Sequence, residues 1–137
     1  MLTELLDQNP DFAPGRWVPC PPTTDRDAWD TLPGFDRLLA AGNAAAREGR
    51  RIPALPLSLW LRFIRKGERV KYEAAYFARR RTLARLALAE ALSDAGQFLP
   101  QIADYVWAIC EESAWQLPAH NSYIRDTPQL PLPDTSR

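Results

Sequence analysis

The chain has 137 residues, of which 46% are hydrophobic and 25% charged, and its formal net charge at pH 7 is zero. This composition is typical of a single globular domain and excludes a disordered chain. Without net charge there is no global field to recruit nucleic acid or an anionic membrane surface, so neither is a predicted partner. No apolar run approaches the roughly 20 residues that a membrane span needs.

The N-terminal sequence and the cysteines predict a cytoplasmic location. LTELLDQNPD is acidic and lacks the basic region and apolar core of a signal peptide. Cys20 and Cys110 lie 90 positions apart, and in a reducing compartment they are expected to be free thiols. Two isolated cysteines and one histidine have no metal-ligand spacing, so we predict neither a metal nor another cofactor.

Residues 1–34 predict a proline-rich N-terminal arm. Six of the 13 prolines lie in it, and they disfavour regular structure apart from a short helix over 2–8 and a turn over 25–31. Trp17 and Trp29 either anchor this arm to a helical body or stack on a sugar ring. A second proline-rich stretch, residues 126–137, predicts a C-terminal tail.

Between these two segments, residues 35–125 predict an all-α domain. Helices are expected over 35–48, 57–66, 68–95 and from 98 to about 112 or 114, and the first three end at Gly49, Gly67 and Gly96. No alternating strand pattern appears. The two-residue link Gly96-Gln97 predicts that the last two helices pack as an antiparallel hairpin.

The last helix leads into the stretch with the most chemistry. Apolar residues at helical spacing form one stripe, namely Phe98, Ile102, Tyr105, Val106 and Ile109. Polar and aromatic side chains then gather around Pro118, in the order Trp115, His120, Asn121 and Tyr123. Such a helix end predicts the wall of a ligand cleft, with Trp107 packed in the core and Trp115 available to stack on a sugar.

Charge is distributed unevenly along the chain. Residues 62–85 contain nine basic side chains and only two acidic ones, whereas the charged side chains of residues 86–126 are mainly acidic. One interpretation is a cationic surface that binds an anionic polymer, because guanidinium groups suit carboxylates and sulfates. The other is that antiparallel helices complement each other's charge. On the second interpretation one of Glu111 and Glu112 pairs with a basic neighbour and the other is solvated.

Residues 54–121 resemble the bacterial heparinase II/III-like polysaccharide lyases. The matching stretches are LPLSLWLRFIRKGERVKYEAAYFARRRTLARLALAEAL and GQFLPQIADYVWAICEESAWQLPAHN. The second is the more specific, through WAICEES, a tryptophan and PAHN in that order. The first matches more loosely, through FARRR and LALAEAL.

The resemblance implies a fold and an activity. Members of this family have an α/α toroid followed by β-sandwich domains, and they cleave uronic-acid polysaccharides by β-elimination. It implies that this chain is an N-terminal fragment forming the first part of an incomplete toroid, and that it lacks a complete active site. The implied partner is an acidic polysaccharide or oligosaccharide. The alternative is a non-catalytic helical binding or assembly module, and in either case exposed apolar helix faces predict a homo-oligomer.

The resemblance and the chemistry of β-elimination together suggest site residues. The reaction needs a group that neutralises the uronate carboxylate, a base and an acid. His120 and Asn121 are the candidate catalytic residues, and His120 is otherwise a structural hydrogen-bonding residue. The candidate substrate-binding residues are Trp115, Tyr123, Glu112 and Arg80.

Overall fold

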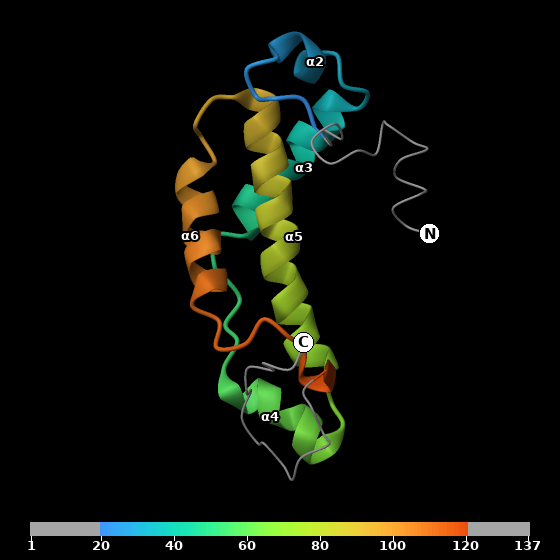
Figure 1. Ribbon diagram of the computed structural model, residues 1–137, viewed down its shortest axis with the longest axis vertical. Coiled ribbons are helices and arrows are strands. Elements are labelled where there is room, and N and C mark those ends of the chain that lie inside the picture. The colour runs from blue at the N-terminus through green and yellow to red at the C-terminus, as the bar shows by residue number, and fades with distance from the viewer. Residues whose placement is uncertain (1–19, 121–137) are drawn as a thin grey trace, which may run out of the picture.

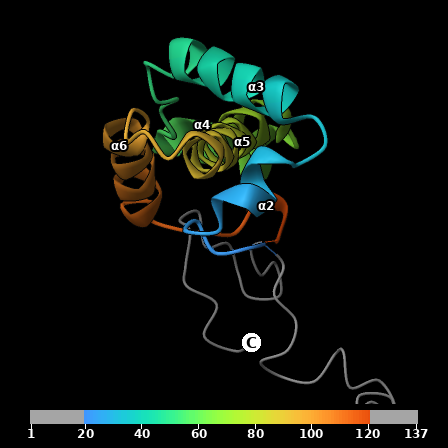
Figure 2. The same cartoon turned by 90° about the horizontal axis from the view of Figure 1, so that it is seen from above.

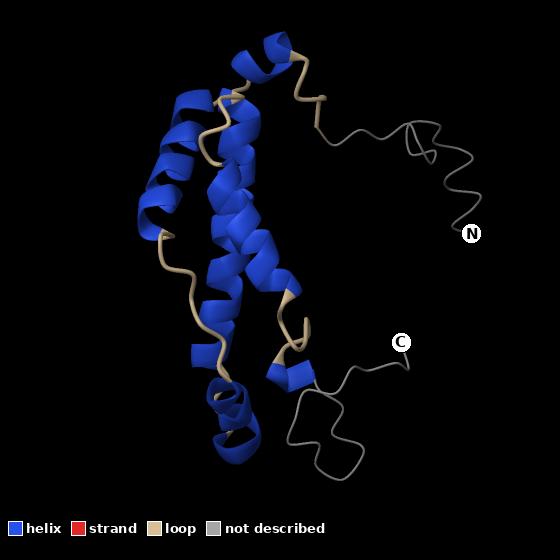
Figure 3. Cartoon of the chain, turned by 90° about the vertical axis from the view of Figure 1, so that its left-hand side faces the viewer, coloured by secondary structure: helices blue, strands red, loops and turns tan. Residues whose placement is uncertain are grey.

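Helices make up the regular structure of residues 20–120, the range that the computed structural model describes. In chain order they are α2 (Arg26–Asp30), α3 (Phe35–Glu48), α4 (Leu57–Lys66), α5 (Val70–Ser93), α6 (Leu99–Cys110) and the 3-10 helix η2 (Pro118–His120). That range contains no strand (Figure 3), which confirms the all-α fold class. The helix predicted over 2–8 and the tail over 126–137 lie outside it.

Helix α5 is the element on which the others assemble. It contacts α2, α3, α4 and α6, and a view along its axis shows α3 and α6 on two different sides of it (Figure 2). Helices α5 and α6 run side by side in opposite directions (Figure 1), which confirms the predicted hairpin. The Glu90 carboxylate holds the link between them by accepting hydrogen bonds from the backbone N–H groups of Gly96 (2.5 Å) and Phe98 (2.8 Å).

The upper half of α5 in Figure 1 packs against α3 and α6 around small side chains. Gly42 of α3 lies so close to Ala89 of α5 that a Cβ added to Gly42 would meet the Ala89 Cβ at 2.1 Å. Around this contact a core forms from Ala45, Leu86, Ala89, Phe98 and Tyr105. The Tyr105 hydroxyl donates to the Gly49 carbonyl at 3.1 Å, which ties α6 to the end of α3.

The lower half of α5 has a second, aromatic core. Trp60 of α4 packs edge-to-face on Tyr72, with ring centroids 5.3 Å apart, and Tyr72 stacks on Tyr76 at 6.1 Å. Ala114 and Leu117, which follow α6, pack against the same cluster. Along α5 the buried arginine Arg79 lies between Tyr76 of the aromatic core and Leu86 of the first core.

Helix α2 fixes the end of the predicted arm onto α5. Trp29 is buried, and its indole N–H donates to the Pro22 carbonyl at 3.1 Å, so Trp29 is an anchor and not an exposed stacking platform. The Arg26 guanidinium donates to the carbonyls of Ala91 and Leu92 in the last turn of α5. A cation there satisfies carbonyls that have no partner within the helix and complements the helix dipole. Trp17 lies outside the described residues.

Three expectations for α6 are wrong: its last residue, the burial of Trp107 and the burial of Val106. The helix ends at Cys110, before the expected 112–114, because the following residues turn back onto α5. Trp107 is 68% exposed and not in the core. It lies about 200° around the helix from the buried Tyr105, so it faces away from α5.

The outer face of α6 carries a second apolar stripe. Val106 belongs to it and not to the buried stripe, and with it Leu99 and Trp107 are exposed. The predicted homo-oligomer through exposed apolar helix faces stays a prediction, and these are the side chains of α6 that it would use.

Candidate functional site

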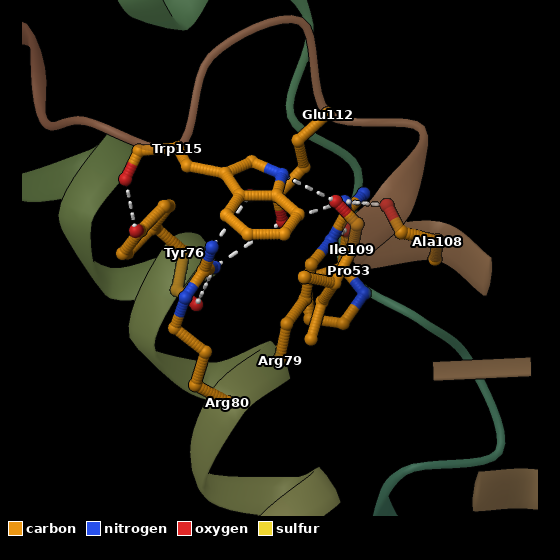
Figure 4. A network of polar contacts seen from close by, with 8 residues as sticks. All are labelled: Pro53, Tyr76, Arg79, Arg80, Ala108, Ile109, Glu112 and Trp115. Atoms are coloured by element: carbon orange, nitrogen blue, oxygen red, sulfur yellow. Dashed lines mark hydrogen bonds and ion pairs between the residues drawn. The ribbon is translucent and has the colours of Figure 1, made fainter. Parts of the chain in front are cut away.

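The chain after α6 folds back over the lower half of α5, and Trp115 is the centre of this turn. The Tyr76 hydroxyl donates to the Trp115 carbonyl at 2.5 Å, and the Trp115 indole N–H donates to the Ile109 carbonyl at 3.1 Å (Figure 4). The Ile109 carbonyl, in the last turn of α6, also accepts a hydrogen bond from the backbone N–H of Glu112 at 3.2 Å. Trp115 is therefore held at two points while 65% of its surface stays exposed.

Glu112 anchors the same turn through two arginines of α5. Its side chain is 2% exposed. Arg80 donates to both carboxylate oxygens, from Nη1 to Oε1 at 3.2 Å and from Nη2 to Oε2 at 2.8 Å. Arg79 Nη1 adds a bond to Oε1 at 3.1 Å. The carboxylate thus lies between two guanidinium groups, one of them in the two-point geometry that suits arginine.

Arg79 also connects segments that are distant in sequence. Its Nε donates to the Pro53 carbonyl at 2.7 Å, and its Nη1 donates to the Ala108 carbonyl near the end of α6 at 3.0 Å. One buried guanidinium therefore joins the α3–α4 connection, α5 and α6. The neighbouring Arg80 guanidinium lies over the Tyr76 ring, 3.3 Å from its centroid, and makes a cation–π contact.

A cavity of about 270 Å³ lies between the start of α4, the first half of α5 and the segment that follows α6. Polar and apolar atoms contribute about equally to the surface of its walls. They comprise Leu55, Leu57, Trp60, Tyr72, Arg79, Ala108, Glu111, Glu112, Ser113 and Ala114. The Trp60 Nε1 is buried and has no hydrogen-bond partner.

The cavity wall keeps Tyr72 protonated. Burial, with the Glu112 carboxylate second and Tyr76 third, raises the pKa of Tyr72 to about 12. The phenol is therefore a hydrogen-bond donor over the whole physiological range.

The raised pKa of Tyr72 predicts a specific loss of stability in alkali. A tyrosine near pKa 10 when unfolded and near 12 when folded binds more protons in the folded state between these values. Its contribution is therefore complete below pH 10 and disappears as the pH rises through 12, a loss on the order of 2 kcal/mol. Urea unfolding between pH 9 and 12 should show this loss in the native chain and a smaller one in Tyr72→Phe. Equal pH dependence in both chains would contradict the prediction.

The structure brings two of the predicted site residues together and leaves the others apart. Arg80 and Glu112 form an ion pair with each other. Trp115 is exposed, and His120 is exposed at the end of η2, outside the cavity wall. Asn121 and Tyr123 lie outside the described residues.

Three residues that line the cavity were not predicted as site residues from the sequence, namely Arg79, Trp60 and Tyr72. For Arg79 a signal was available: it follows Tyr72 by seven residues and Tyr76 by three, and so lies on the buried stripe of α5. The FARRR run obscured this signal, because three consecutive arginines suggest one solvated charge cluster.

The pairing of Glu112 with α5 agrees with the charge-complementarity interpretation for Arg79 and Arg80. Glu112 is the paired carboxylate, while Glu111 is exposed. The arginines of α5 therefore fall into two groups. Arg79 and Arg80 pair with Glu112, whereas Arg81 and Arg85 are exposed.

Comparisons with known proteins add no family assignment. No protein-family model matches the chain, and a search of curated proteins finds no match. Within residues 20–120, no group of three or more His, Cys, Asp or Glu side chains could hold a metal ion. In the same range no helix has the length and apolarity to cross a bilayer.

Proposed function

We propose that the chain contributes helical hairpins to an α/α toroid of the heparinase II/III-like lyase type, with the segment after α6 forming part of the wall that binds a uronic-acid polysaccharide. Antiparallel packing of α5 and α6 supports this. A further support is that the most specific motifs of the resemblance, from WAICEES to PAHN, include the segment that Glu112 and Trp115 anchor on α5.

The observation that carries the proposal is the position of Trp115. An aromatic ring stacks on a sugar only if it is exposed, and it binds well only if little conformational freedom is lost on binding. Trp115 meets both conditions, because it is 65% exposed and its indole N–H and backbone carbonyl are both hydrogen-bonded.

Within this proposal the predicted site residues have separate roles. Trp115 contacts substrate. Glu112 is a positioning residue, because its carboxylate is buried and already accepts three hydrogen bonds. Arg80 has the same positioning role through its pairing with Glu112. His120 is exposed at the end of η2, and in this proposal its imidazole would serve proton transfer or hydrogen bonding to a uronate.

Replacing Trp115 by alanine tests the proposal. Calorimetric titration with a heparan-derived hexasaccharide should give at least about tenfold weaker binding for Trp115→Ala. The scale is taken from the stacking of nucleic-acid bases on aromatic side chains, which is worth on the order of 1–3 kcal/mol. Trp115→Phe keeps an aromatic face and should retain most of the affinity.

The matched control is Val70→Ala, which trims a side chain that is 70% exposed at the start of α5. Its affinity should equal that of the native chain. Unchanged binding in Trp115→Ala would refute the proposal, as would no binding of acidic oligosaccharide by the native chain. Thermal melts of each variant separate lost binding from lost folding.

A further inference from the structure

The outer side of α6 carries a continuous apolar stripe. Leu99, Val106 and Trp107 are 55%, 44% and 68% exposed. Ala103 and Cys110, on the same side of the helix, are exposed as well. With a turn of about 100° per residue, these five side chains fall within about 100° of the helix circumference. Figure 2 shows α6 at the edge of the bundle, with α5 on one side of it and no other described helix beyond it.

The composition of this stripe is that of the core of a protein–protein interface. None of its side chains is charged, and Asp104 is the one charged residue of α6. Interface cores are depleted of charge and enriched in aromatic residues, and tryptophan is among the residues that contribute most to binding. A contiguous exposed apolar patch of this kind marks a site at which another protein surface packs.

The stripe is complementary in shape to a second copy of itself. In an antiparallel pair of α6 helices whose two-fold axis passes the midpoint of Leu99–Cys110, Leu99 lies opposite Cys110. By the same register Ala103 lies opposite Val106. Each larger side chain then meets a smaller one, the arrangement in which facing layers interdigitate. A parallel pair would instead place Val106 against Val106 and Trp107 against Trp107.

Charge also favours a second copy on α6 and disfavours one on α5. The outer side of α5 exposes Val70 and Phe77, but Arg81 and Arg85 are exposed along the same helix. Two such surfaces would repel each other, because like charges placed together are unfavourable at an interface. On α6 each copy brings only the carboxylate of Asp104, which lies beside the stripe and is exposed to solvent.

We propose that the outer face of α6 is a homodimer interface, in which the α6 helices of two copies pack antiparallel with Trp107 of each copy beside Ala103 of the other. The predicted homo-oligomer thereby acquires a defined surface and register. The contact spans 12 residues, about 18 Å of helix, so the dimer is in exchange with the monomer, as interfaces of small area usually are. This goes beyond the proposed function and does not depend on it, because substrate contact was assigned to Trp115 and not to Trp107.

Sedimentation velocity of the full chain tests the dimer, with reductant present. The native chain should convert from monomer to dimer between about 1 μM and about 1 mM, the range in which small interfaces dissociate. Trp107→Glu places a charge in the stripe and should weaken dimerisation at least about thirtyfold, the effect of losing a residue that dominates an interface. Val70→Glu places the same charge on α5, at a position that is 70% exposed, and should dimerise like the native chain. Thermal melts should show both variants folded, because both positions are exposed.

Cysteine cross-linking tests the antiparallel register. Leu99→Cys would face Cys110 of the second copy. The two Cys110 side chains would lie about 16 Å apart along the helices, too far for a disulfide. Both chains used carry Cys20→Ser, because Cys20 is also exposed. Under mild oxidation Leu99→Cys with Cys20→Ser should form covalent dimers, and Cys20→Ser alone should not.

Three outcomes would overturn the inference. A native chain that stays monomeric at the highest concentration would leave the α6 face to a different partner or to residues outside 20–120. A dimer that Trp107→Glu leaves intact would place the interface elsewhere. Covalent dimers of Cys20→Ser through Cys110 would replace the antiparallel arrangement by a parallel one. Titration of Trp107→Glu with the hexasaccharide should match the native chain, so failure of the dimer and failure of the Trp115 platform are measured separately.

Discussion

Glu112→Ala is expected to lower the free energy of unfolding by about 3–5 kcal/mol, the usual cost of removing one partner of a buried ion pair. The side chain is 2% exposed, and its loss leaves the Arg79 and Arg80 guanidinium groups facing each other without a counter-charge. The turn after α6 would lose its anchor on α5. Chemical denaturation followed by circular dichroism measures the change.

Glu111→Ala is the matched control, because it removes the same side chain from the adjacent, exposed position. Its effect should stay within about 0.5 kcal/mol. Glu112→Gln keeps the shape and removes only the charge, so it should fall between the two. Equal stabilities of Glu111→Ala and Glu112→Ala would show that the ion pairs of Glu112 with Arg79 and Arg80 contribute nothing to folding.

Gly42→Ala is expected to destabilise the protein by roughly 2–3 kcal/mol, the upper part of the range for overpacking. Helix propensity alone would favour alanine by about 1 kcal/mol at this interior position of α3. Packing opposes it, because the new Cβ would meet the Ala89 Cβ at 2.1 Å and the Arg85 carbonyl oxygen at 3.3 Å. The two helices would have to separate, which opens the core that Ala45 and Leu86 form.

A second substitution, at Ala89, tests whether the close contact between Gly42 and Ala89 causes the loss of stability. Ala89→Gly removes the opposing methyl group, so the double variant Gly42→Ala with Ala89→Gly should recover most of the lost stability. Ala87→Gly, at an exposed position of α5, measures the separate cost of a helical glycine. If Gly42→Ala were as stable as the native chain, or if the double variant were no better than the sum of its parts, close packing of α3 on α5 would not be the cause.

Local sequence signals account for the ends of α3 and α4 and for the antiparallel connection of α5 to α6. Gly49 and Gly67 end α3 and α4 as predicted. Gly67 has φ 66°, the left-handed conformation that glycine tolerates. Gly49 has φ −84° and is needed for space, because a Cβ there would meet the Ala45 carbonyl oxygen at 2.7 Å. The short link around Gly96 determined that α5 and α6 are antiparallel. The helical spacing also placed Phe98 and Tyr105 in the core correctly. Each of these signals acts within a few residues of the chain.

The side chains of the candidate site are brought together by packing between helices that are distant in the sequence. Arg79 and Glu112 are 33 residues apart, and their pairing depends on how α5 and α6 are rotated about their own axes. That rotation is determined by packing on both sides of α5, including the close approach of Gly42 to Ala89. It also leaves Trp107 outside and Trp60 at a cavity wall. Helical spacing places Arg79 on the same stripe of α5 as Tyr72 and Tyr76, but local spacing contains no information on which residue of α6 or of the following turn pairs with it.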